Sequence, residues 1–296
     1  MWIPVTLAAA VFQILRTSRQ HQLRSSLSVN AAGYVRYTYG FPLAVLATVI
    51  SFFVLGEELP IVPVRFWPII GAAGFAQILG TLALLRSFDL RDFAIGTVYA
   101  KTEIVIVAIV SAVALGETLR PLGWLAIVLC MTGVAWLAAP RHLGEAVSSI
   151  ADPAALMGIL AASGFALAAV GIRAASNSLS DAPAFHRALL TLTVMLGMQT
   201  VLNGTQLFTS APAEFVSVYK VWRSALPVGI LSVCGSAGWA VAVTLTNAAK
   251  VRTLGQVELL MAFAISAWWL HEQHLRSEYI ASAMVMAGVV GVIALG

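Results

Sequence analysis

The chain has 296 residues, of which 60% are hydrophobic and only 10% are charged. A soluble domain is about half apolar and about a quarter charged, so a soluble fold with this composition would expose a largely apolar surface. The formal net charge of +4 comes from 17 basic residues spread thinly along the chain, which argues against a nucleic-acid partner and leaves the lipid bilayer as the natural environment.

Ten apolar segments are long enough to be membrane-spanning helices, which need about 20 mostly apolar residues. In chain order they are 2–20, 32–55, 66–86, 93–115, 119–138, 154–174, 185–207, 225–247, 254–271 and 277–295. The first is the least apolar, because Gln13, Arg16 and Arg19 interrupt it. Its start lacks the basic region of a cleaved signal, so we predict a retained helix.

The longest polar interruption, at 139–153, predicts a connecting loop between two domains. The N-terminal five-helix repeat would cover 1–138 and the C-terminal one 154–296. Cys130 and Cys234 are isolated in apolar stretches, which indicates neither a disulfide framework nor a metal site. We expect no cofactor and no metal.

The two halves repeat at a constant shift of 155 residues. Four landmarks match without a gap: Glu103 with Glu258, Glu117 with Glu272, Trp124 with Tyr279, and Gly133 with Gly288. Because each half has five helices, an odd number, equivalent helices would cross the membrane in opposite directions. Such inverted repeats are typical of transporters, whose substrate site lies between the repeats.

An acidic residue, an apolar run, an acidic turn and a glycine-bearing last helix recur in both halves, as Glu103 to "LGETL" and as Glu258 to "LHEQHL". This pattern resembles the drug/metabolite transporter superfamily, in its ten-helix EamA-like branch, and is most similar to bacterial amino-acid exporters, in particular aromatic amino-acid exporters. Ile104 and Leu259 occupy positions where that family has proline. The resemblance implies an all-α integral membrane fold, two inverted five-helix repeats around a central cavity, in the bacterial cytoplasmic membrane.

Three ionisable residues lie inside apolar segments, where they are costly and suggest function. Glu103 and Glu258 occupy matching positions, so they would either join helices structurally or couple transport to protons. Lys101 has Gln256 at its matching position. It would therefore either contact an asymmetric substrate or extend its stem to the membrane interface.

We expect the substrate to contact aromatic and amide side chains at mid-membrane depth, because a small amphipathic ligand needs apolar walls with a few polar groups. The predicted substrate-binding residues are Gln77, Tyr99, Phe165, Trp239 and Gln256. If 93–115 is a regular helix, Tyr99 and Glu103 share a face and Lys101 lies on the other side.

These features predict a secondary transporter that exports small metabolites by alternating access. The expected substrates are amino acids, in particular aromatic or other large neutral ones. A nucleotide-sugar, phosphorylated-metabolite or lipid-like carrier of the same fold is the main alternative. An intramembrane enzyme would need clustered catalytic groups, whereas His271 and His274 flank Glu272 in a loop.

The orientation and the oligomeric state stay open. Ten basic residues, Arg36 among them, follow odd-numbered segments and six follow even-numbered ones. The positive-inside rule would place both termini outside, whereas the family resemblance implies termini inside.

Overall fold

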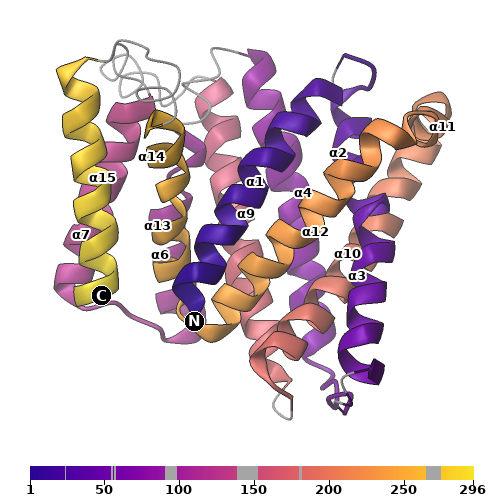
Figure 1. Cartoon of the computed structure of the whole chain (residues 1–296), viewed down its shortest axis with the longest axis horizontal. Helices are drawn as coiled ribbons and strands as arrows, with labels where there is room; N and C mark the ends of the chain where they lie inside the picture. Colours follow the sequence, from indigo (N-terminus) through magenta and orange to yellow (C-terminus); the bar gives the residue numbers. More distant parts are fainter. Residues whose placement is uncertain are drawn as a thin grey trace. The chain divides into compact units, whose positions relative to one another are not determined.

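The computed structural model describes the whole chain except residues 24, 55, 57, 91–98, 139–152, 180–181 and 265–274. Every regular element in the described residues is a helix, as predicted (Figure 1). In chain order these are α1 Trp2–Leu23, α2 Val29–Thr38, α3 Gly40–Val49, the π-helix η1 Ile50–Val54, α4 Phe66–Leu90, α6 Glu103–Leu115, α7 Pro121–Ala138, α9 Pro153–Ser178, α10 Ala184–Ser210, α11 Pro212–Lys220, α12 Trp222–Leu245, α13 Ala248–Gly255, α14 Val257–Ala264 and α15 Arg276–Leu295.

Six helical segments are long and apolar enough to cross a membrane by length and composition, and Glu103–Leu115 and Pro121–Leu137 are shorter apolar helices. The first predicted segment, 2–20, forms the continuous helix α1 but is not among the six. The predicted segment 32–55 is divided into α2, α3 and η1, with a turn at Tyr39. Ser28 begins α2 as its N-cap, because its hydroxyl accepts a hydrogen bond from the Ala31 N–H.

Helix bounds in the two halves follow the shift found in the sequence. Val29 and Ala184, which begin α2 and α10, are 155 residues apart, as are Pro121 and Arg276, which begin α7 and α15. The ends of α4 and α12, Leu90 and Leu245, show the same separation. The predicted connecting loop, by contrast, lies almost wholly outside the described residues.

Residue contacts divide the chain into two compact units. Unit 1 comprises Met1–Ile78 and Ala168–Thr246, and unit 2 comprises Leu79–Leu167 and Asn247–Gly296. Each unit therefore draws on both halves of the sequence, and the long helices α4 and α9 contribute to both units.

Within unit 1, α1 packs along α12, and α10 packs against α2 and α3. A Cβ added to Gly238 would lie only 2.8 Å from the Ala9 Cβ, so a glycine allows α12 to approach α1 closely. The end of α12 is held by Arg173 of α9, whose Nη1 donates to the Val243 and Thr246 carbonyls at 2.5 Å each. These carbonyls belong to the last turn and its continuation, where a helix has no backbone donors of its own.

Within unit 2, α7 and α15 lie side by side (Figure 1). A Cβ added to Gly133 would lie 2.8 Å from the Val285 nitrogen, and one added to Gly288 would lie 2.5 Å from the Cys130 Cβ. Small residues at such positions let membrane helices approach closely. Near the other end of the pair, Gly123 faces Gly296. As residue numbers rise along α7, the numbers of the residues that they contact on α15 fall. The two equivalent helices are therefore antiparallel.

Candidate functional site

Two helices of unit 2 are interrupted at equivalent places. Tyr99 and Ala100 are helical, Lys101 and Thr102 form a turn, and α6 begins at Glu103. In the second half α13 ends at Gly255, Gln256 forms a turn, and α14 begins at Val257. The expectation of a regular helix through 99–103 is therefore wrong, and the face that Tyr99 and Glu103 would share on such a helix does not exist.

Local side-chain hydrogen bonds accompany the two interruptions. The Thr102 hydroxyl donates to the Tyr99 carbonyl at 2.6 Å, and the Gln256 amide donates to the Arg252 carbonyl at 3.1 Å. Side chains that bond nearby backbone carbonyls offer the chain an alternative to the helical pattern. Inside a membrane, such irregular backbone is tolerated only where protein buries it or where it lines a cavity.

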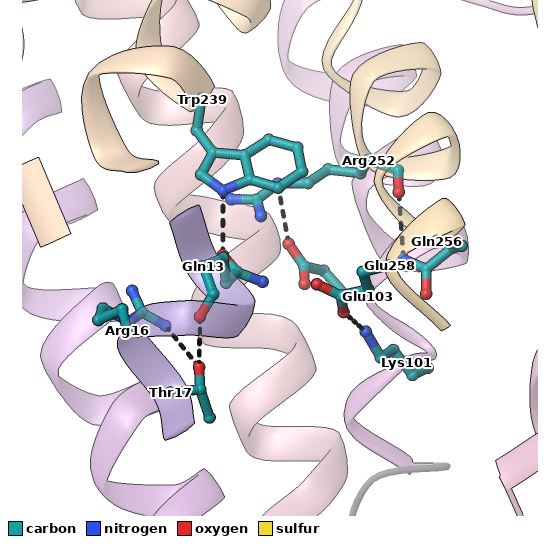
Figure 2. Close-up of polar contacts among 9 residues, drawn as sticks. All are labelled: Gln13, Arg16, Thr17, Lys101, Glu103, Trp239, Arg252, Gln256 and Glu258. Atoms are coloured by element: carbon teal, nitrogen blue, oxygen red, sulfur yellow. Dashed lines mark hydrogen bonds and ion pairs between the residues drawn. The ribbon is translucent and has the colours of Figure 1, made fainter. Parts of the chain in front are cut away.

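Four charged side chains meet at these interruptions (Figure 2), and we call them the crossed ion pairs. The Lys101 ammonium donates to Glu258, and Arg252 Nε lies 3.1 Å from Glu103 Oε1. All four side chains are between 13% and 17% exposed. Each pair joins a residue of one half of the sequence to a residue of the other half, and the net charge of the four is zero.

The two carboxylates are equivalent in the repeat but their cations are not. Glu103 and Glu258 both lie in the first turn of a helix, α6 and α14, where the helix dipole favours negative charge. Lys101 is two residues before Glu103, whereas Arg252 is six residues before Glu258. The symmetric positions therefore carry the acids, and the asymmetric positions carry the bases.

The predicted substrate-binding residues fall in both units. In unit 2, Gln256 is 5% exposed and contacts the Arg252 backbone (Figure 2), while Tyr99 is buried against Ala155 and Ile159. Phe165 is on α9, close to Gly80 of α4. The structure thus brings Tyr99 and Gln256 to the helix interruptions that carry the crossed ion pairs.

The other two predicted residues bind glutamines within unit 1. Gln77 of α4 accepts a hydrogen bond from the buried Gln199 of α10 at 2.9 Å. The Trp239 indole N–H of α12 donates to Gln13 Oε1 of α1 at 3.0 Å (Figure 2). Whether any of these residues contacts substrate remains a prediction.

Sequence reasoning missed several polar residues. Arg252 and Arg36 lie within helices, α13 and α2, and not in the connections between apolar segments. Gln13 and Gln199, which bond Trp239 and Gln77, also differ from the predicted set. The one available signal was spacing: Gln13, Arg16 and Gln20 recur at three and four residues, which predicts a polar stripe along α1.

Apolar helices interrupted beside buried charges are typical of membrane transporters. Residues 152–294 match the EamA-like transporter family, so the resemblance is confirmed over the C-terminal half of the chain. A solved structure described only as "Crystal structure of protein" has the same fold, with a TM-score of 0.72 and 15% identity over 98% of this chain and 96% of that chain. At that identity the likeness concerns the fold alone. No curated protein matches the chain.

Proposed function

We propose that this protein is a secondary transporter that exports amino acids, with a preference for aromatic or other large neutral ones, by alternating access. The family match makes transport of a small solute the starting point. The observation that carries the choice of substrate is the crossed ion pairs. Both cations of the set are already paired with carboxylates, so the set leaves no excess positive charge for a phosphorylated metabolite and favours a substrate without net charge.

Two inverted repeats would supply the conformational change. The matching helix bounds support a duplication, and the antiparallel packing of the equivalent helices α7 and α15 supports opposite directions through the bilayer. In transporters built from inverted repeats, alternating access arises when one repeat or bundle rocks against the other. Interrupted helices such as α13–α14 are the elements that commonly surround the substrate in such proteins.

Counterflow in proteoliposomes tests the proposal. Vesicles loaded with unlabelled L-tryptophan, L-phenylalanine or L-leucine should accumulate labelled L-tryptophan faster than protein-free vesicles. Vesicles loaded with L-glutamate, L-lysine, a sugar phosphate or a nucleotide sugar should not. If only the phosphorylated compounds or nucleotide sugars support exchange, amino-acid export is the wrong function and the anionic-metabolite carrier replaces it.

A further inference from the structure

Arg36, which is 6% exposed, is the most buried Arg, Lys, Asp or Glu among the described residues. It lies in the last turn of α2, within the apolar membrane-spanning segment Val29–Val54. A charge at such a place is costly unless an opposite charge and hydrogen bonds compensate it. The charges of unit 2 are compensated in this way in the crossed ion pairs. We therefore expect an anion to compensate the charge of Arg36 as well.

The described part of the chain does not supply an anion to Arg36. Its guanidinium carbon lies 5.2 Å from the centroid of the Tyr37 ring, and its Nε has no hydrogen-bond acceptor among the described residues. The Tyr37 hydroxyl, on a side chain that is only 1% exposed, likewise has no partner among them. An aromatic ring attracts the cation but accepts none of its five N–H donors. Both donors lack an acceptor among the described residues, which favours a ligand that accepts from them.

The position of Arg36 also favours a ligand. It is three residues before Tyr39, where the helix between α2 and α3 is interrupted, and interrupted helices surround substrates in transporters. At the shift of 155 residues its equivalent is Thr191, which is fully buried and uncharged. The cation thus exists in one half only, as expected of a group that recognises one end of an asymmetric molecule.

We propose that Arg36 and Tyr37 bind the carboxylate of the transported amino acid. The guanidinium donates to both carboxylate oxygens, a geometry that arginine provides and lysine does not, and the Tyr37 hydroxyl donates to one of them. A single guanidinium balances the single charge of a carboxylate, whereas a phosphorylated metabolite would bring further negative charge. This inference rests on the proposed function and states where the carboxylate end of the substrate binds.

Transport by matched variants is the first test. Arg36→Gln should lower the rate of L-tryptophan counterflow about 100-fold and Arg36→Lys about 10-fold, because the charged bidentate contact is lost wholly or in part. Tyr37→Phe, which removes one hydroxyl, should raise the half-saturating concentration about 5-fold. Thr191→Val, the matched control at the equivalent position, should transport normally. Tryptamine, which lacks the carboxylate, should not exchange in the wild type.

Binding by the resting protein is the second test, and it does not depend on turnover. Sodium benzoate should raise the Tm of the detergent-solubilised wild type, relative to sodium chloride at equal ionic strength, and should leave the Tm of Arg36→Gln unchanged. Equal shifts in both proteins, or a larger Arg36-dependent shift with inorganic phosphate, would overturn the carboxylate site.

The two tests separate the proposals. If the wild type exchanges no amino acid but the benzoate shift depends on Arg36, the amino-acid function is wrong and the carboxylate site stands. If Arg36→Gln exchanges L-tryptophan as fast as the wild type, the function stands and the site is wrong.

Discussion

Glu103 and Glu258 occupy equivalent positions, and each pairs with a cation from the other half of the chain. Duplication of the acids suits a symmetric structural role better than a proton relay through one carboxylate. In that role, each pair would hold an interrupted helix of one half against an interrupted helix of the other.

We therefore expect Glu103→Gln and Glu258→Gln to lower the stability of the protein while keeping measurable exchange. Each substitution leaves a nearly buried cation without its anion, which costs about 3 kcal/mol when a buried pair is broken on one side. Thermal unfolding in detergent and counterflow in proteoliposomes measure the two effects.

The double variant Lys101→Gln with Glu258→Gln is the control, because it removes both charges of one pair and should recover part of the lost stability. Complete loss of transport in a well-folded single variant would instead favour proton coupling through that carboxylate.

At this scale the sequence identified the acids but not all of their partners. The repeat identified Glu103 and Glu258, because two carboxylates at matching positions of apolar segments can be recognised without a structure. Arg252 was hidden, since the sequence places it next to Lys250 in what reads as a basic loop, and only the folded chain shows that it meets Glu103 across 149 positions. Pairing between distant segments depends on helix rotation, which spacing does not determine.

At the scale of elements, α7 and α15 depend on two glycines. We expect Gly288→Ala to destabilise the protein by about 1–3 kcal/mol, the range for overpacked interiors, because its Cβ would lie 2.5 Å from the Cys130 Cβ. The Tm in detergent measures this.

Gly33→Ala is the matched control in α2, where no heavy atom lies within 4 Å of the added carbon. Alanine is also the better helix former, so this variant should be as stable as the wild type. Equal Tm values for the two variants would show that α7 and α15 do not pack as described.

The end of α12 provides another prediction. Arg173→Met should expose the last turn of α12, because the guanidinium donates to carbonyls that have no backbone donor in the helix. Hydrogen bonds to charged groups contribute about 1.5–3 kcal/mol each, so a loss of about 3 kcal/mol is reasonable for the set.

Hydrogen–deuterium exchange measures this effect. Amides near 243–246 should exchange faster in Arg173→Met than in the wild type. The exposed Arg120→Met serves as a control and should leave these amides protected. Unchanged protection in Arg173→Met would contradict the capping role.

The existence of the helices was predictable, but their interruptions were not. Long apolar segments indicate helices through composition alone, and the structure agrees wherever it describes them. At the breaks, Thr102 and Gln256 donate to carbonyls three and four residues back, but the same kind of bond, such as that from Thr132 to Val128, also occurs inside unbroken helices. Threonine and glutamine are ordinary helix residues elsewhere in this chain, so their presence did not predict where a helix would stop.

For the whole molecule, the inverted repeat makes a topological prediction. Arg120 and Leu275 are 155 residues apart, are both exposed, and immediately precede α7 and α15. If the repeats are inverted, single cysteines introduced at these positions in a cysteine-free background should react with a membrane-impermeant maleimide from opposite sides of the bilayer.

Intact cells or sealed vesicles of known orientation give the measurement, and permeabilised vesicles provide the control in which both cysteines react. Labelling of both positions from the same side would show that α7 and α15 cross the membrane in the same direction. The inverted repeat, and with it the argument for alternating access, would then be wrong.

The contacts between α7 and α15 have the form of an isologous interface, the kind that a two-fold homodimer makes with itself. Gly133 meets Val285, and Gly288 meets Cys130, the residue equivalent to Val285. The two copies of a homodimer have the same sequence. One copy could therefore not carry a lysine where the other carries a glutamine, as at positions 101 and 256 of this chain. If one polypeptide carries both repeats, this constraint is absent. The α7–α15 contacts keep the form of a symmetric interface while Lys101 differs from Gln256, and Arg36 from Thr191.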